Sequence, residues 1–379
     1  MKKIKLLHIQ LLPLLSGVQK KMLRLLDALD REKYDIYVIC RPGGPLVDKI
    51  IKSGYKYIPV TSLRRNLSLW DFISLIKIYL ICREYRFDIV HTHSSKTGFL
   101  GRIAARLAGT PKIIHTVSGF PFHAQQFYLV RFFYIMLEAF ASLFCDYLVI
   151  VNEYEKHFIQ NTRLFSTKKV LTIFNGVYTD PEMEPRLYGP KGMIKPQKSL
   201  PELVDYFVIG SMARFAKAKN IVNFTKVAIS VCRENPLIKF VFIGDGEYWD
   251  ECYDLVASSG MHQQIIMPGW QNNIEYWLMN IDMFASYSYW EGLSNSILEA
   301  MSFGLPIIAS NIVGNNEQVD DENGILVPVD DHVRFRKILT ELPSRQNDLE
   351  RWSRNSLSKC RELFSLRQFV EGYEKLYLS

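Results

Sequence analysis

Two glutamates separated by a short glycine-containing loop are the residues best placed to do chemistry. Glu291 follows an apolar run that predicts a strand, and Glu299 lies eight residues later, in a helix predicted over 295–303. Ser294 is a typical N-cap residue for that helix. The backbone N–H groups of the loop 292–295 are therefore expected to point outward at a helix N-terminus, a favourable site for a pyrophosphate. Carboxylates beside such a site can accept hydrogen bonds from sugar hydroxyls, although an isolated pair of glutamates is usually just solvated surface.

The rest of the chain gives this pair its context. The segment 289–301 resembles the E-x7-E motif of the family 4 retaining glycosyltransferases, and other segments resemble further motifs of that family in the same order. These segments are Val90–Lys96, Asn175–Val177, Gly210–Arg214 followed by Lys219, Gly244–Glu247, Pro268–Trp270, Gly304–Ser310, Gly314 with Glu317, and Asn323–Val327. Each motif alone is only moderately specific, but their common order over most of the chain identifies it as a member of this family.

The resemblance implies a role for each matched residue. Arg214 and Lys219 would neutralise the donor diphosphate as the glycosidic bond breaks, one as a planar fork and the other as a point charge. Glu299 would hold the ribose hydroxyls, and Glu291 would contact the hydroxyls of the donor sugar. The other donor-binding residues implied are Gly17, Gly246, Trp270, Gly292, Leu293 and Ser294.

The resemblance also implies how the reaction proceeds. Family members retain the anomeric configuration by a front-face route assisted by the donor phosphate, and no carboxylate stands out here as a nucleophile for double displacement. The sequence holds no D-x-D motif. We therefore expect no metal site and no cofactor, with the nucleotide-sugar as a co-substrate.

The chain departs from the family pattern at one position that matters. Ser118 stands where the family typically has a histidine that contacts the donor sugar. His115 lies on the same predicted strand but should face the other side. His123, five residues beyond Ser118, is a candidate to take over the contact. Ser118 and His123 are accordingly the predicted sugar or acceptor contacts.

The elements that must position these residues follow a regular order. Short apolar runs alternate with helical patterns from residue 4 to 151 and again from 207 to 327, which is typical of parallel βαβ units. We predict an α/β protein of the GT-B fold, with two Rossmann-like doubly wound domains and an interdomain cleft. The predicted parts are an acceptor-binding domain over 1–180, a proline-rich linker over 178–201, a nucleotide-sugar domain over 200–362, and a C-terminal helix over 364–379 that packs back on the first domain.

Composition narrows the classes of partner. The net charge is +7, but the basic residues are scattered apart from small clusters at Lys20-Lys21-Arg24 and Arg64-Arg65, so no nucleic acid is expected. The six cysteines show no C-x-x-C pair or metal-ligand spacing, which favours buried, reduced thiols in the cytosol. The apolar start of the chain, interrupted by His8 and Gln10, predicts a buried strand in place of a signal peptide.

One apolar region has two interpretations. The segment 127–151 is rich in aromatic residues but contains Arg131, Glu138 and Asp146. It is either a buried helix followed by a strand, or a helix whose aromatic face touches a bilayer, with Phe127, Phe132, Phe133 and Tyr134 on that face. No uninterrupted apolar stretch is long enough for a spanning helix.

These observations predict a retaining hexosyltransferase. It would move a hexose or N-acetylhexosamine from a nucleotide-sugar, with UDP as the first choice, to a lipid-linked saccharide in lipopolysaccharide O-antigen or capsule biosynthesis. It would work in the cytoplasm, peripherally on the inner face of the cell membrane. Two alternatives remain open: a degenerate scaffold subunit, suggested by Ser118, and a nucleotide-sugar 2-epimerase of the same fold.

Overall fold

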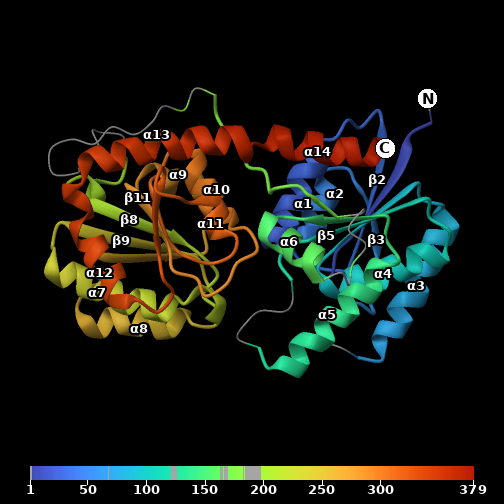
Figure 1. Cartoon of the computed structure of the whole chain (residues 1–379), viewed down its shortest axis with the longest axis horizontal. Helices are drawn as coiled ribbons and strands as arrows, with labels where there is room; N and C mark the ends of the chain where they lie inside the picture. Colours follow the sequence, from blue (N-terminus) through green and yellow to red (C-terminus); the bar gives the residue numbers. More distant parts are fainter. Residues whose placement is uncertain are drawn as a thin grey trace. The chain divides into compact units, whose positions relative to one another are not determined.

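The chain forms two compact units, described here from a computed structural model (Figure 1). The first unit contains residues 1–176 and 366–379, and the second contains residues 177–365. The structure describes residues 2–66, 68–120, 126–162, 165, 170–181, 183 and 198–379. Most of the predicted linker and His123 lie outside these residues.

The first unit is built on a seven-stranded parallel sheet in the order β3-β2-β1-β4-β5-β6-β7. Its strands are β1 (Ile4–Ile9), β2 (Tyr34–Cys40), β3 (Lys56–Pro59), β4 (Ile89–His93), β5 (Lys112–Val117), β6 (Tyr147–Ile150) and β7 (Val170–Thr172). Its helices are α1 (Gly17–Ala28), α2 (Pro45–Lys52), α3 (Trp70–Tyr85), α4 (Ser95–Leu107), α5 (Tyr128–Ser142), α6 (Glu153–Thr162) and α14 (Leu366–Leu378).

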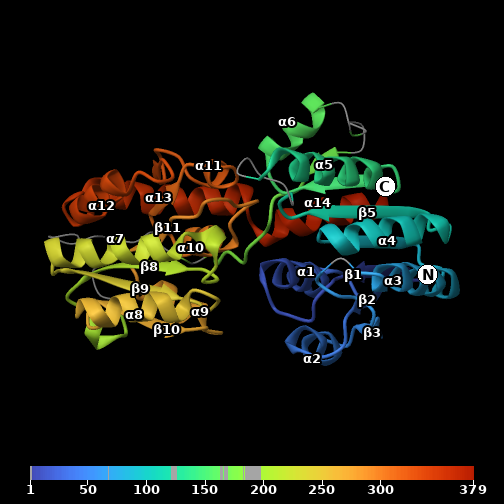
Figure 2. The ribbon, with the colours of Figure 1, turned by 90° about the horizontal axis from the view of Figure 1, so that it is seen from below.

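Both faces of this sheet are covered, because successive strand residues alternate between two cores. Leu6 packs in a core with α1, α2 and α14, whereas Leu7 packs in a second core with α3, α4 and α5. Side chains in a strand point to opposite faces in turn, so strands buried on both faces read as continuous apolar runs. Figure 2 shows helices on either side of the strands. The predicted strand–helix rhythm is therefore that of a doubly wound sheet.

The second unit repeats the plan with six parallel strands in the order β10-β9-β8-β11-β12-β13. Its strands are β8 (Phe207–Met212), β9 (Ile238–Ile243), β10 (Ile265–Gly269), β11 (Met283–Ser286), β12 (Ile307–Ser310) and β13 (Gly324–Val327). Its helices are α7 (Ile221–Glu234), α8 (Trp249–Ser259), α9 (Ile274–Met279), α10 (Asn295–Ser302), α11 (Asn315–Gln318), α12 (His332–Glu341) and α13 (Gln346–Leu363), with short 3-10 turns at Pro201–Leu203, Lys217–Lys219 and Leu342–Ser344.

Helix α14 belongs to the first unit although it follows the second in sequence. Phe369, Tyr373 and Tyr377 are buried in the core that contains Leu6. The hydroxyl of Tyr377 lies 2.7 Å from Nδ1 of His91, whose Nε2 lies 2.7 Å from Oγ1 of Thr116. Lys112 donates hydrogen bonds to the last carbonyls of the helix, a favourable place for a cation.

Three histidines that the sequence did not connect meet in this core. His8, His91 and His93 are all buried, and Nδ1 of His8 lies 2.9 Å from Nε2 of His93. Burial lowers the pKa of His8 to about 3, and it lowers the pKa of the other two as well. The three rings are therefore neutral at physiological pH. Both nitrogens of His91 are occupied by hydroxyls, so the cluster ties α14 to the sheet.

Helix α5 is not the buried helix that its composition suggested. Phe132, Phe133 and Phe140 are exposed, whereas its one buried acid, Glu138, lies inward and pairs with Arg102 of α4 at 2.8 Å. A charged side chain of α5 thus faces the interior while apolar side chains face the solvent, the reverse of an ordinary surface helix. The core interpretation is therefore wrong for the outer face of α5. None of the described helices combines the length and apolar character needed to cross a bilayer.

Candidate active site

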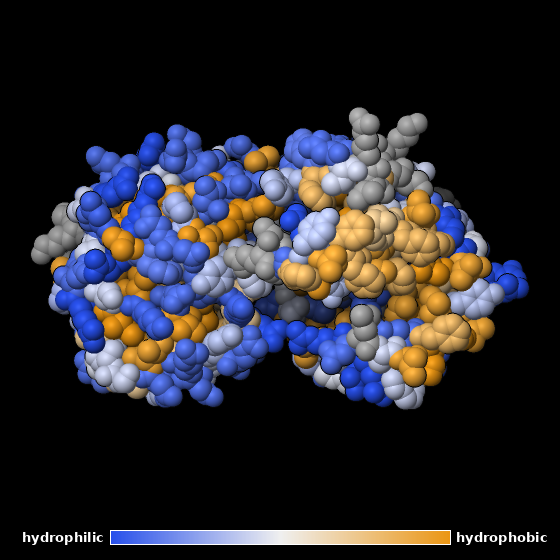
Figure 3. All heavy atoms as spheres, turned by 60° about the horizontal axis from the view of Figure 1, so that its bottom comes forward, coloured by the Kyte–Doolittle hydropathy of each residue, from blue (hydrophilic) through white to orange (hydrophobic). Residues whose placement is uncertain are grey.

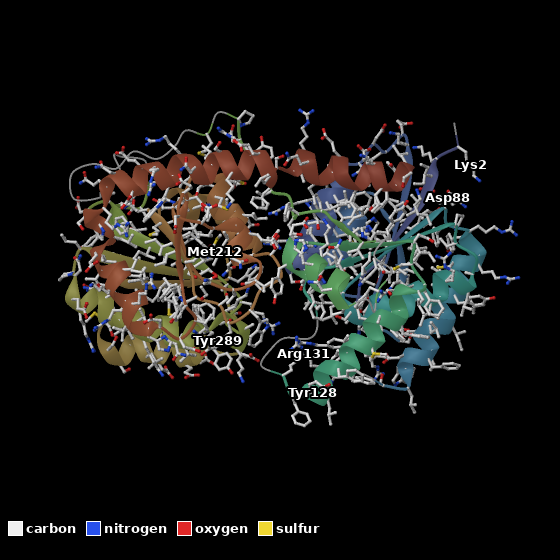
Figure 4. The ribbon with its side chains drawn as sticks, in the orientation of Figure 1. Lys2, Asp88, Tyr128, Arg131, Met212 and Tyr289 are labelled. Atoms are coloured by element: carbon white, nitrogen blue, oxygen red, sulfur yellow. The ribbon has the colours of Figure 1, made fainter. Side chains whose placement is uncertain are left out.

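The predicted site residues of the second unit gather where its strand order reverses. Strands β8 and β11 are neighbours in the sheet but are not consecutive in the chain. The loops that leave the carboxyl ends of such a pair are where open α/β sheets bind ligands. Arg214 and Lys219 lie on the loop after β8, and Glu291 lies on the loop after β11. Figure 4 labels Met212, which ends β8, and Tyr289, from the loop after β11.

These two loops are joined by an ion pair. The ammonium of Lys219 contacts a carboxylate oxygen of Glu291, and the side chains are only 24% and 10% exposed. The hydroxyl of Ser288 donates to the same carboxylate at 2.9 Å. The backbone N–H of Tyr289 donates to the carbonyl of Ala218 at 2.8 Å, which fixes one loop on the other. Arg214, Lys219 and Glu291 are the residues predicted to act in catalysis. The structure thus brings Lys219 and Glu291 together and holds both in a partly water-excluded position.

Arg214 is exposed on a loop supported by two glycines. Gly244 and Gly246 follow β9 with φ of +139° and +154°, where side chains are disfavoured. A Cβ on Gly246 would lie 2.6 Å from the carbonyl oxygen of Phe215, and one on Gly244 would collide with the carbonyl of Ala213. Gly246, predicted to bind the donor, therefore lies directly against the loop that carries Arg214.

The N-terminus of α10 has the cap that the sequence predicts, but its amides are not all available. The side chain of Ser294 accepts from the N–H of Ile297. However, the N–H of Ser294 donates to Oε1 of Gln318 at 3.0 Å, and Gln318 returns a hydrogen bond to the carbonyl of Ser294 at 2.8 Å. The expectation that the whole loop presents open N–H groups is thus wrong at Ser294. Gln318 is fully buried, and the sequence analysis missed it.

Helix α11 also supports the loop that contains Gly292 and Leu293. Gly314, at the start of α11, has φ of +86°, and a Cβ there would collide with the carbonyl of Gly292. Leu293 itself is buried. The predicted donor loop is thus held in place by the close backbone approach of Gly314 and by the hydrogen bonds between Gln318 and Ser294.

The remaining predicted donor residues lie on neighbouring elements. Glu299 is half-buried on α10, a little more than one turn beyond its N-cap. Trp270 directly follows β10, is about half exposed and donates through its ring nitrogen to Asn272 at 3.4 Å. Trp270 thus combines a strand-end position with partial exposure, and an aromatic ring there is a suitable platform for a planar base.

In the first unit, the predicted contacts lie at the carboxyl ends of β1 and β5. Gly17 is exposed at the first position of α1, and Ser118 follows β5. The hydroxyl of Ser118 accepts a hydrogen bond from the ammonium of Lys21 at 2.8 Å. Lys21 is buried, and burial lowers its pKa to about 7. A titratable amine therefore lies beside Ser118, the residue that stands where the family usually has a histidine; in the sequence Lys21 was visible only as part of a basic cluster.

Two family models match the chain, one in each unit. The model described as Glycosyltransferase Family 4 matches residues 15–181, and the model described as Glycosyl transferases group 1 matches residues 195–359. The structure of Anabaena HepE in complex with UDP and glucose is similar in fold, with a TM-score of 0.81 at 16% identity, covering 99% of this chain and 100% of that one.

Curated relatives extend over nearly the whole chain. The Escherichia coli UDP-Gal:alpha-D-GlcNAc-diphosphoundecaprenol alpha-1,3-galactosyltransferase is 37% identical over 381 residues, which cover 99% of this chain and 97% of the relative. The Staphylococcus aureus capsular polysaccharide biosynthesis glycosyltransferase CapM is 22% identical and covers 93% of this chain and 92% of its own length. With motifs, fold and relatives in agreement, the chain belongs to the family 4 glycosyltransferases of the GT-B fold.

Proposed function

We propose that the enzyme transfers a hexose or N-acetylhexosamine from a UDP-sugar to a lipid-linked saccharide, with retention, in O-antigen or capsule biosynthesis. The observation that carries this proposal is the 37% identity, over 99% of the chain, to an E. coli enzyme whose name specifies UDP-galactose and an undecaprenol diphosphate acceptor. UDP-galactose is therefore the first donor to test. The family membership and the retained charges of the site leave the scaffold and epimerase alternatives without support.

The proposed chemistry assigns the donor to the second unit. Negative charge grows on the UDP leaving group as the glycosidic bond breaks, and Arg214 and Lys219 are positioned to stabilise it. Glu299 would hold the ribose, and Glu291, anchored by Lys219, would orient the sugar. Because Arg214 and Lys219 would both serve the diphosphate, we propose that transfer needs no divalent metal, so EDTA should leave the rate unchanged.

Transfer assays with donor and acceptor varied separately test this function. We expect UDP-galactose to give the highest rate among UDP-, GDP- and dTDP-sugars with a GlcNAc-diphospholipid acceptor, and the product to be the alpha anomer by NMR. Glu299→Gln should weaken donor binding by about tenfold or more, since it removes a charged hydrogen-bond acceptor from the site. Glu251→Gln, on the exposed side of α8, is the matched control. Absence of binding to every nucleotide-sugar would refute the proposal.

We also propose that the first unit binds the cytoplasmic face of the membrane through α3 and α5. The apolar α3–α5 surface consists of exposed side chains on both helices: Leu69, Phe72, Ile73, Ile76, Leu80, Phe132, Phe133, Met136 and Phe140. Figure 3 shows apolar residues gathered on this part of the protein, and Figure 4 shows Tyr128 and Arg131 at the start of α5. Exposed apolar area of this kind marks a contact with a partner or a lipid surface.

Flotation with anionic liposomes tests the membrane proposal. The wild-type protein should float with the vesicles, and Phe132→Asp combined with Phe133→Asp should remain in the lower fractions, because burying a carboxylate in the lipid interface is unfavourable. Leu237→Asp combined with Val333→Asp is the control, since both residues are exposed and apolar but lie in the second unit. Equal flotation of the two double variants would count against a membrane role for α5.

A further inference from the structure

A basic cavity in the first unit has no role in the site described above. It has a volume of about 390 Å³ and is lined by Arg41, Arg64, Arg65, Asn66 and Ser68. Arg41 directly follows β2, and the other four lie between β3 and α3. Because β2 and β3 are parallel neighbours, their carboxyl ends bring Arg41 to the arginines that follow β3. We call this cavity the arginine pocket.

The guanidinium groups of the pocket have no acidic partner in the part of the chain that the structure describes. Among the described residues, no ion pair is formed by Arg41, Arg64 or Arg65, and Arg64 instead stacks on the Trp70 ring, with its central carbon 4.6 Å from the ring centroid. Three like charges around one cavity repel each other unless an anion occupies it. Arginine is also the side chain whose planar fork matches phosphate oxygens in pairs.

The loop that carries two of these arginines is held in place by Lys96. This lysine donates to the carbonyl of Arg64 at 2.8 Å and to the carbonyl of Asn66 at 2.5 Å, and its ammonium pairs with Asp71 at 2.6 Å. The side chains of Lys96 and Asp71 are only 10% and 17% exposed. The loop is thus fixed through its backbone by a largely buried ion pair, while the arginine side chains remain exposed.

Apolar surface begins where the pocket ends. Leu69, directly after the pocket residue Ser68, is 93% exposed, and Phe72 in the first turn of α3 is 67% exposed. They open the α3 part of the α3–α5 surface. A cationic pocket that leads directly onto apolar surface matches a molecule with phosphate at one end of a hydrocarbon chain. A soluble anion would need only the pocket.

We propose that the arginine pocket binds the diphosphate of the lipid-linked acceptor, and that the lipid chain runs from it along α3. This inference rests on the proposed function, because it assumes a lipid diphosphate acceptor. The pocket lies at the carboxyl edge of the same parallel sheet as Gly17 and Ser118. A diphosphate fixed there would hold the acceptor sugar toward the residues of that edge.

To test whether the arginines bind the acceptor diphosphate, we compare two acceptors that carry the same sugar, one with a diphosphate and one without. One is GlcNAc-diphospholipid and the other is an alkyl GlcNAc glycoside without phosphate. For Arg64→Gln combined with Arg65→Gln, we expect the KM of the diphosphate acceptor to rise by about tenfold or more, since each lost charge-assisted hydrogen bond is worth about that factor. The KM of the glycoside and of the UDP-sugar should not change. Arg83→Gln, an exposed arginine near the other end of α3, should behave as wild type.

The other outcomes overturn the proposal. Equal losses with both acceptors would assign the arginines to folding or to general membrane attraction. A higher KM for the UDP-sugar would assign the pocket to the donor.

Equilibrium binding of the diphospholipid in neutral detergent, with inorganic pyrophosphate as competitor, gives a result that does not depend on transfer. If binding depends on the arginines while no sugar is transferred, the pocket stands and the proposed reaction fails; if transfer proceeds without that dependence, the pocket fails alone.

Discussion

Replacing Lys219 with methionine is expected to lower kcat by about 10²–10³-fold, the usual effect of removing one preorganised charge from a developing anion. The variant also leaves Glu291 without its cationic partner in a position that is only 10% exposed. A carboxylate in such a place is unfavourable beside a diphosphate, so donor affinity should fall as well. Steady-state kinetics with saturating acceptor, together with calorimetric titration of UDP, measures both effects.

The matched control for this variant lies in the same turn. Lys217→Met removes a lysine two residues earlier that is exposed and whose ammonium makes no hydrogen bond or ion pair with the described residues. It should keep kcat within about twofold of wild type, because exposed charges contribute little. Lys219→Arg should recover part of the lost rate, since it restores charge with a different shape. If Lys217→Met and Lys219→Met lost the same activity, the role assigned to Lys219 would be refuted.

Replacing Gly314 with alanine is expected to destabilise the second unit by about 3 kcal/mol and to abolish measurable donor binding. The added Cβ would have to occupy a left-handed backbone conformation, at about 1–2 kcal/mol, and would push against the carbonyl of Gly292, where overpacking costs about 1–3 kcal/mol. The carbonyl cannot rotate away as a side chain would, so the loop before α10 must shift. Urea unfolding monitored by fluorescence and UDP titration measure the two effects.

Gly260 provides the control for the Gly314 variant. It also has a positive φ, +74°, but a Cβ there would meet nothing within 4 Å. Gly260→Ala should therefore cost only the conformational term, about 1–2 kcal/mol, and should leave donor affinity unchanged. Comparable losses of donor affinity in both variants would show that backbone strain, and not contact with Gly292, governs the loop.

Much of the fold was predictable because parallel strands buried on both faces leave a strong signal. β4 is buried at every position, and it lies with β1, β2 and β5 in the stretch from 4 to 151 where alternating strands and helices were predicted; α14, predicted over 364–379, spans Leu366–Leu378. The elements that were missed lack such a signal. α11 has only four residues, too few for a helical period, and α13 carries a narrow buried stripe among many charged residues. Composition left two interpretations of α5 open, since an apolar pattern does not reveal which side faces the core; the exposure of Phe132, Phe133 and Phe140 favours the exposed aromatic face.

Features of the site were predictable where a residue and the element that it contacts are close together in the sequence. Ser294 caps α10 because cap and helix are adjacent in sequence. Contacts between distant segments were not predictable. The bond from Lys21 to Ser118 requires β1 and β5 to share an edge, and lysine is almost never buried, so the sequence marked Lys21 only as one member of a basic cluster. Arg64 and Arg65 were visible as a cluster, but Arg41 joins them only through the pairing of β2 with β3.

The position of α14 has a consequence for how the protein is made. The hydrogen-bonded histidine core of the first unit is closed by Tyr373 and Tyr377, which leave the ribosome after every residue of the second unit. The nascent first unit therefore emerges early, but the core between its sheet and α1 and α2 stays incomplete until α14 is synthesised. The second unit consists of consecutive residues and can close as soon as it is synthesised. The half of the enzyme that is translated first is thus the half whose core is completed last.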